Sequence, residues 1–261
     1  MKNPFADKAT TAIWQETPTS DNPYNAQFCR LHGYELFDVA KNCRYVDTLF
    51  LLFKGELPDK HQSELLEQLM IFLINPGPRH PATRAAMNAG VSKSDHAHIL
   101  PIGLIAMGGH HLGSAEVENA MHFLKNHIRS NPTEVAKKQL LAFIPEAEGD
   151  NRIAPGIGSR FASIDAYAAR LAAHLGTFEA TGKAFKWYEA FVGETSKKNL
   201  SWLNTGIAAA VFFDFGLGAR EGAGLFQLMS APGILAHGLE QTHKPITAMP
   251  LIEDENYVIE K

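Results

Sequence analysis

The chain has 261 residues, of which 45% are hydrophobic and 20% charged, an ordinary composition for a globular protein with a sizeable core. The formal net charge is -4 at pH 7, and lysine and arginine are spread along the chain, so no basic tract indicates binding to nucleic acid or to an anionic membrane. The longest apolar run, residues 207–213, is far too short to span a bilayer.

Residues 1–30 are predicted to form an irregular N-terminal arm, because this segment is polar and contains several prolines. Its first ten residues have no apolar core of the kind that a signal peptide needs. Cys29 and Cys43 lack the spacing of a metal site and are expected to be reduced thiols. Together these features predict a cytoplasmic protein.

Beyond the arm, apolar residues recur at helical spacing along nearly the whole chain. Two short helices are predicted within 31–53, around Asn42-Cys43, and a third begins at Pro58 after a stop at Gly55 and ends before Pro76. Three helices have a predicted cap: one is capped near Ser114, one begins at Asn131-Pro132 and runs to Phe143, and one is capped by Ser163 and runs to Leu175. The remaining predicted helices are His80–Ala89, Ala97–Met107, Ala180–Val192, Asn204–Phe215 and Gly224–Leu239. The helix over Ala97–Met107 is nearly apolar throughout and is expected to be buried on all sides. Sustained period-two alternation is missing from the sequence, which therefore predicts an all-α fold.

The segment Pro155-Gly156-Ile157-Gly158-Ser159-Arg160 is the most distinctive motif. Two glycines around one apolar residue let the backbone pass close to a ligand, and the arginine that follows can meet an anion. A Gly-x-Gly pair is more often an ordinary turn, and a structural ion pair is the competing interpretation of the arginine. The motif resembles the Pro-Gly-x-Gly-His-Arg signature of the citrate synthase and citryl-CoA lyase superfamily, with serine at the histidine position.

Four further segments resemble the same superfamily in the same order. They are Gly33-Tyr34, the run from Leu51 to Pro58 with its Gly-Glu-Leu-Pro link, the run from Asn199 to Gly206, which resembles a strand-like entry to a helix, and the closing helix from Pro232 to Gln241. The resemblance implies a citrate synthase-like fold in which a large helical domain, 31–114 and 205–261, pairs with its twin in a homodimer. A smaller helical domain, 115–204, is expected to close over a cleft.

The resemblance also implies chemistry between an acyl-CoA and a small oxo acid. In that family an aspartate removes the α-proton of the thioester, one histidine stabilises the enol and another polarises the keto group, while arginines bind carboxylates. Pro155, Gly156, Ile157 and Gly158 are the residues expected to approach coenzyme A, which acts as a substrate, and no tightly bound cofactor is expected.

Several positions depart from the family pattern. Thr205 stands where the aspartate belongs and Ser159 replaces a histidine, and neither carries a charge. Tyr167 and Ser230 stand at positions where the family has arginines, which removes two anion clamps. The expected substrate-binding residues are therefore Arg160, Arg84, Tyr167 and Ser230, with a solvated helix face as the competing interpretation of Arg84.

The remaining catalytic histidine depends on the alignment. Counting back from Ala115 places Leu112 at the family's histidine position, whereas counting forward from Gly108 places His111 there, and both alternatives stay open. With His111 included, the predicted catalytic residues are His111, Ser159 and Thr205. The histidines at 80, 96, 98, 110 and 111 are expected to line a pocket, cap helices or face solvent rather than bind a metal, since residues two apart on a helix do not face each other.

Two main functional hypotheses follow, and a structural oligomer that binds no ligand is a third. The first is a divergent citrate synthase-like acyltransferase or citryl-CoA lyase that makes or breaks a carbon–carbon bond. The second is a pseudoenzyme, a CoA-binding or regulatory subunit that pairs in a hetero-oligomer with an intact paralogue. Glycines, caps and apolar faces are retained while polar positions are exchanged, which indicates that the fold is still in use.

Overall fold

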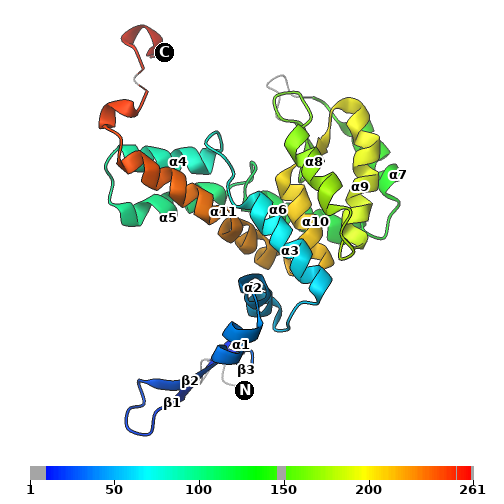
Figure 1. Ribbon diagram of the computed structural model, residues 1–261. Helices are drawn as coiled ribbons and strands as arrows, with labels where there is room; N and C mark the ends of the chain where they lie inside the picture. Colours follow the sequence, from blue (N-terminus) through cyan, green and yellow to red (C-terminus); the bar gives the residue numbers. More distant parts are fainter. Residues whose placement is uncertain (1–9, 146–150, 251, 260–261) are drawn as a thin grey trace, which may run out of the picture. The chain divides into compact units, whose positions relative to one another are not determined.

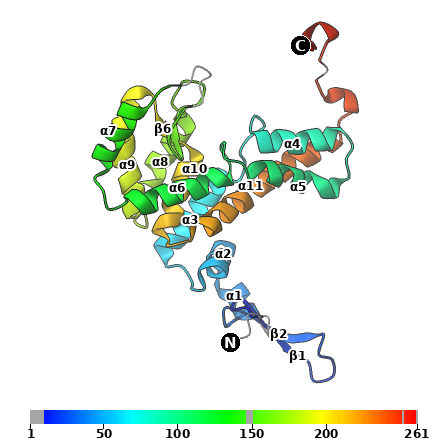
Figure 2. The same ribbon diagram turned by 180° about the vertical axis from the view of Figure 1, so that it is seen from behind.

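The structure is a computed structural model that describes residues 10–145, 151–250 and 252–259. The chain divides into two compact units, one ending at Glu67 and the other beginning at Gln68. Figures 1 and 2 show the elements, eleven of which are α-helices among the described residues. The predicted all-α fold class is confirmed.

The elements are bounded as follows. The helices are α1 (Leu36–Asn42), α2 (Tyr45–Lys54), α3 (Lys60–Leu73), α4 (Pro81–Val91), α5 (His96–Met107), α6 (Ser114–His127), α7 (Pro132–Ala142), α8 (Ala166–Leu175), α9 (Lys183–Thr195), α10 (Asn204–Asp214) and α11 (Ala219–Thr242). The strands are β1 (Trp14–Pro18), β2 (Ala26–Leu31), β3 (Tyr34–Glu35), β4 (Arg152–Ala154), β5 (Ile157–Gly158) and β6 (Ser201–Trp202), in two antiparallel sheets ordered β1-β2-β3 and β4-β5-β6.

The first unit opens with a β-hairpin, so the expectation of an irregular segment was wrong for residues 10–30. Strand β1 pairs with β2 in the register Trp14↔Leu31, and His32 and Gly33, both with positive φ, form the tight turn to β3. The hairpin strands are largely exposed, so they lack the apolar alternation that would have identified them. Leu31, Val39 and Leu51 form one buried hydrophobic cluster of this unit, with Cys43 packed against it.

The turn between α2 and α3 was predicted in part. Gly55 ends α2 with a φ of 78° and donates its backbone N–H to Leu51 O at 2.8 Å, as expected. Helix α3 begins after Pro58, not at it, because Asp59 and Gln62 form reciprocal side-chain-to-backbone hydrogen bonds of 2.8 and 3.0 Å. This capping box sets the first helical residue at Lys60.

In the second unit, α4, α5 and α11 pack together, and α6 packs against α10 and α11 (Figures 1 and 2). Helix α10 is the centre of this arrangement, since Thr205 to Phe212 are all buried. The expectation that helix α5 is buried on all sides was wrong, because Ile105 in this helix is 79% exposed. The apolar composition of this helix therefore did not predict its burial.

The starts of the later helices correct two predictions. Helix α6 has Gly113, a neighbour of Ser114, as its N-cap, as predicted, whereas helix α8 is capped by Asp165 instead of Ser163, with the carboxylate accepting from Ala168 N at 3.0 Å. Asn131 caps α7 as predicted. Helix α9 begins at Lys183, three residues later than predicted, because a distant side chain caps it there.

That side chain is Asp214, at the C-terminal end of α10. Its carboxylate accepts hydrogen bonds from the backbone N–H groups of Gly182 (3.0 Å), Ala184 (2.7 Å) and Phe185 (3.0 Å). We expect Asp214→Ala to lower the free energy of unfolding by about 2–4 kcal/mol, since three partly buried amides lose a charged acceptor. Urea unfolding measures this loss, and Glu189→Ala, an exposed position on α9, is the matched control. Equal midpoints for the two variants would show that the cap contributes nothing.

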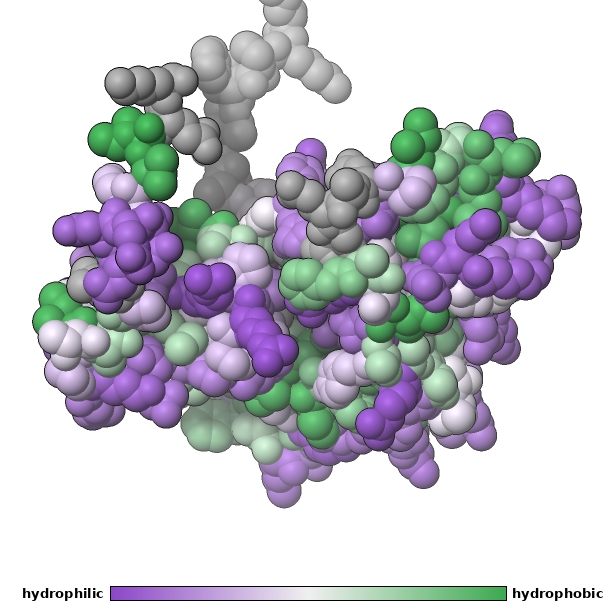
Figure 3. All heavy atoms as spheres, turned by 90° about the horizontal axis from the view of Figure 1, so that it is seen from above, coloured by the Kyte–Doolittle hydropathy of each residue, from purple (hydrophilic) through white to green (hydrophobic). Residues whose placement is uncertain are grey.

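The surface is mostly polar with interspersed apolar groups on the face shown in Figure 3. The most exposed large apolar side chains of the helical part include Leu141 at 90% and Ile144 at 84%. Among the described residues, none of the helices combines the length and the apolar character that a membrane crossing requires. The cytoplasmic location stays a prediction.

Candidate functional site

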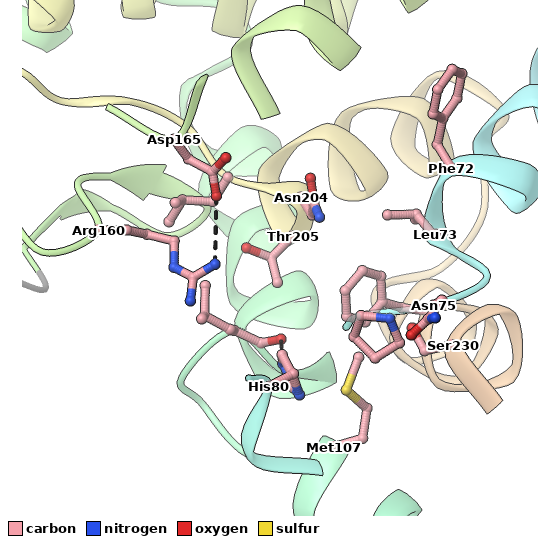
Figure 4. A pocket seen from close by; sticks show the side chains of 14 residues that line it. Phe72, Leu73, Asn75, His80, Met107, Arg160, Asp165, Asn204, Thr205 and Ser230 are labelled. Atoms are coloured by element: carbon pink, nitrogen blue, oxygen red, sulfur yellow. Dashed lines mark hydrogen bonds and ion pairs between the residues drawn. The ribbon is translucent and has the colours of Figure 1, made fainter. Parts of the chain in front are cut away.

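A small cavity of about 50 Å³ lies within the second unit, where several loops meet the start of α10 and the middle of α11 (Figure 4). It is lined by Phe72, Leu73, Asn75, Pro76, His80, Met107, Leu112, Arg160, Asp165, Leu203, Asn204, Thr205, Phe226 and Ser230. Segments far apart in the sequence thus contribute to one partly open cavity, which is the candidate functional site.

Three polar atoms of the lining are buried and have no hydrogen-bond partner among the residues that the structure describes. They are Thr205 Oγ1, Asn204 Oδ1 and Arg160 Nε. Thr205 is only 1% exposed, and Figure 4 shows its side chain among Arg160, His80 and Asn204. Because a buried polar atom without a partner is costly, a group of them facing one cavity indicates that a ligand or ordered water completes their hydrogen bonds.

Arg160 is paired across the cavity wall with Asp165. Its Nη1 lies 3.6 Å from Asp165 Oδ2, and its guanidinium lies over the Phe161 ring, 5.7 Å from the centroid. Asp165 is also the N-cap of α8, so its carboxylate is fixed by the helix. The only arginine of the lining therefore faces its only carboxylate.

His80 lines the cavity as the N-cap of α4. Its Nδ1 accepts from Ala82 N at 3.2 Å, so Nε2 carries the proton and donates to Leu112 O at 3.1 Å. Burial lowers the pKa of His80 below its usual 6.5, and the nearby Arg160 and His111 act in the same direction, while the bond to Leu112 O opposes them. The imidazole is therefore neutral at pH 7 and holds Leu112 in place.

This arrangement predicts a pH-dependent stability. Since the folded pKa of His80 lies below the unfolded value of 6.5, its contribution is fully present above pH 6.5 and is lost as the pH falls below it. Between pH 7.5 and pH 5, we expect the Tm of the wild type to fall further than the Tm of His80→Asn, because asparagine can cap α4 and does not titrate. The exposed His98→Asn serves as the control and should follow the wild type. Parallel pH profiles for the wild type and His80→Asn would contradict the assignment.

Glu116, in the first turn of α6, connects the two loops next to the cavity. Its side chain is 4% exposed, and Oε1 accepts from Arg152 Nε at 2.7 Å and from Gly156 N at 3.3 Å. Its Oε2 accepts from Leu112 N at 3.0 Å. Leu112 has a φ of 56°, which is uncommon for a residue other than glycine, and it is held between Glu116 and His80.

The Pro155–Gly158 motif packs inside the protein next to the cavity. Gly156 has a φ of 76°, and a Cβ there would lie 2.3 Å from Gly206 Cα, while a Cβ on Gly158 would lie 2.0 Å from Asn151 O. Ile157 is fully buried in the second sheet, and Tyr188 Oη donates to Pro155 O at 2.9 Å. None of these four residues lines the cavity, and their predicted contact with coenzyme A stays a prediction.

The other predicted site residues fall into two groups. Arg160, Thr205 and Ser230 come together in the cavity lining, whereas Ser159 is buried outside it and Arg84 is exposed. The predicted roles of all five stay predictions.

Tyr167 and His111 also lie outside the lining. Tyr167 is 52% exposed, and its hydroxyl is 3.5 Å from Phe72 O. Of the two alternatives for the family's histidine position, His111 is exposed outside the lining, and its neighbour Leu112 lines the cavity.

His80 lines the cavity and caps α4, two of the placements expected for the five clustered histidines, although it was not named as a site residue. Asn75 and Asn204 line the cavity and were not predicted. The local signal at His80 is a polar residue directly before Pro81, the pattern of an N-cap followed by a first-turn proline. In the part of the chain that the structure describes, no three His, Cys, Asp or Glu side chains group in a way that could bind a metal ion.

Comparison with solved structures identifies the fold. The chain matches citryl-CoA lyase from Hydrogenobacter thermophilus with a TM-score of 0.76 and 24% identity, over 97% of this chain and 94% of the lyase. It matches ATP citrate lyase from Methanothrix soehngenii, solved in complex with citrate and coenzyme A, with a TM-score of 0.71 and 17% identity, over 100% of this chain and 44% of the other.

A third match is citrate synthase from Thermoplasma acidophilum, solved in a ternary complex with carboxymethyl coenzyme A and oxaloacetate. Its TM-score is 0.62 with 16% identity, over 83% of this chain and 57% of the synthase. No protein-family model and no curated protein sequence matches the chain. The citrate synthase-like fold predicted from the sequence is confirmed by these structures.

Proposed function

We propose that this chain, which has the fold of citryl-CoA lyase and citrate synthase, binds an acyl-CoA and makes or breaks a carbon–carbon bond between the thioester and an oxo acid. The observation that carries the proposal is the group of unpartnered buried polar atoms, Thr205 Oγ1, Asn204 Oδ1 and Arg160 Nε, in one cavity of that fold. A carbonyl and a carboxylate are the groups that a hydroxyl and a guanidinium would bind there.

In the synthetic direction a base removes the α-proton of the thioester, the resulting enolate carbon attacks the keto carbon, and the keto oxygen gains a proton to become a hydroxyl. The lyase direction reverses each step. Arg160 would bind the carboxylate of the oxo acid, and the Thr205 hydroxyl would donate to the developing oxyanion. Both nitrogens of His80 are engaged with backbone groups, which leaves Asp165 as the carboxylate of the lining able to accept the α-proton.

The domain division and the oligomer belong to the same proposal. Residues 115–204 would form the smaller domain, 31–114 and 205–261 the larger one, and two chains would form a homodimer. Size-exclusion chromatography with light scattering measures the number of chains. A strictly monomeric protein at micromolar concentration would contradict the dimer.

The first experiment measures binding and turnover separately. Coenzyme A and acetyl-CoA in excess should each raise Tm, since a ligand that binds only the folded state stabilises it. Acetyl-CoA incubated with an oxo acid should then yield a hydroxyacyl-CoA or free thiol, detected by mass spectrometry and by thiol titration. Thr205→Val, which removes the hydroxyl at similar volume, should keep the Tm shift with coenzyme A and lose turnover. A protein whose Tm responds to no CoA compound would refute the proposal.

A second candidate is a CoA-binding subunit without activity of its own. It is favoured by Thr205, which stands where an aspartate was expected, and by Asp165, whose carboxylate is already opposite Arg160. This candidate predicts a Tm shift with coenzyme A, no turnover by the chain alone, and altered turnover when the chain is mixed with an intact paralogue. Turnover by the purified chain would exclude it.

A further inference from the structure

The charge of the cavity restricts which oxo acid can enter it. Among its fourteen lining residues, Arg160 is the only arginine or lysine and Asp165 the only carboxylate, and the two are 3.6 Å apart. His80 is neutral because it is buried and its Nδ1 accepts a backbone hydrogen bond. The formal charge of the lining is therefore zero before any ligand enters.

We propose that the oxo acid bound here is a monocarboxylic one with a small apolar substituent, and not a dicarboxylic one. This inference rests on the proposed function and names its substrate class. One carboxylate can bind the donors of Arg160 that Asp165 does not occupy. A second carboxylate would find no further cation among the fourteen lining residues, which is unfavourable for a charge that is removed from water.

The remaining lining fits this class. Thr205, Asn204 and Ser230 supply neutral polar groups for the keto oxygen. The apolar side chains around them would face a methyl or ethyl substituent, and they are Leu73, Met107, Leu112, Leu203 and Phe226. The additional arginine nearby, Arg79, is exposed and lines a wider, more open cavity, which shares Pro76, His80, Arg160 and Asp165 with the inner one but not its apolar side chains.

The test compares two four-carbon oxo acids that differ only in their terminal group, a methyl in one and a carboxylate in the other. Isothermal titration of the full chain with 2-oxobutanoate and with freshly dissolved oxaloacetate should give a dissociation constant at least about tenfold lower for 2-oxobutanoate. Equal affinity, tighter binding of oxaloacetate, or binding of neither acid would each overturn the inference.

Asp165→Asn isolates the charge from the helix cap. Asparagine is as good an N-cap as aspartate, so α8 keeps its start while the carboxylate that neutralises Arg160 is removed. We expect the preference for 2-oxobutanoate to shrink at least about threefold, because the free arginine then attracts the dianion. Asp95→Asn, at the exposed N-cap of α5, should leave the preference unchanged. An unchanged preference in Asp165→Asn would also refute the inference.

These measurements do not involve coenzyme A, so the two proposals fail separately. If the protein prefers 2-oxobutanoate but neither binds nor turns over any CoA thioester, the proposed substrate class is supported and the proposed reaction is refuted. If the protein turns over acetyl-CoA fastest with oxaloacetate, the proposed reaction is supported and the proposed substrate class is refuted.

Discussion

Gly156→Ala is expected to destabilise the second unit by more than about 3 kcal/mol, or to prevent it from folding. Gly156 has a φ of 76°, and a Cβ would lie 2.3 Å from Gly206 Cα and 2.6 Å from Gly206 N. These are backbone atoms, which cannot move aside as the end of a flexible side chain can. The same residue donates to Glu116 and accepts from Leu203 N at 3.0 Å, so any shift of the turn also breaks the contacts beside the cavity.

Chemical unfolding followed by the fluorescence of Trp187 and Trp202, both in the second unit, measures the effect. Gly193→Ala is the matched control, since Gly193 lies inside α9 and a Cβ there meets nothing within 4 Å. That variant should gain about 0.5–1 kcal/mol, because alanine loses less backbone entropy than glycine in a helix. A Gly156→Ala protein with the wild-type midpoint would show that the close approach of the two glycines is not needed.

This result would also define what the Gly-x-Gly motif does. Glycines at 156 and 158 suggested a backbone surface for a ligand, which stays a prediction, and the structure gives both of them a packing role against Gly206 and Asn151. A sequence pattern cannot separate these two uses, because both require the absence of a Cβ. The difference depends on which backbone lies opposite, and Gly206 is far away in the sequence.

The helices were predictable because their signals are local. Asn131 followed by Pro132, and Gly55 at the end of α2, act on neighbouring residues, and the structure bears both out. The β-hairpin at residues 14–31 was not predictable, since its strands are mostly exposed and carry no apolar alternation. The start of α9 was missed for a different reason, which is that Asp214 caps it from another helix.

The cavity was predictable only where it coincides with motif positions. Arg160 and Thr205 belong to segments that resemble a family, and both line the cavity. His80 and Asn75 come from a loop without such a motif, and their position next to α10 is a consequence of the tertiary fold. Glu116 gave no signal, because an acidic residue in the first turn of a helix is normally a solvated partner of the helix dipole.

Glu116→Ala is the second change with a large expected effect. We expect a loss of about 3–5 kcal/mol, because removing one partner of a buried ion pair leaves the other without compensation. Arg152 would keep a partly buried guanidinium whose Nη2 already has no partner, and the N–H groups of Leu112 and Gly156 would lose their acceptor. Glu116→Gln should fall between the wild type and Glu116→Ala, since the amide keeps one accepting oxygen.

The control is Glu118→Ala, two residues further along α6. Glu118 is 34% exposed and makes only long contacts, 3.8 Å to His122 and 4.0 Å to Arg220, so its removal should cost less than about 0.5 kcal/mol. Adding Arg152→Met to Glu116→Ala should recover part of the loss, because the uncompensated charge is then also removed. Equal losses in Glu116→Ala and Glu118→Ala would refute the role assigned to Glu116.

The same carboxylate connects stability to the site. Leu112 keeps its left-handed backbone because Glu116 accepts from its N–H and His80 donates to its carbonyl, and Leu112 forms part of the cavity wall. Glu116→Gln replaces one of the two accepting oxygens with an amide group, so it should weaken the binding of 2-oxobutanoate even where the protein remains folded. Titration below the unfolding transition measures this directly. If Glu116→Gln is destabilised but folded and binds 2-oxobutanoate with wild-type affinity, the buried ion pair does not determine the shape of the cavity.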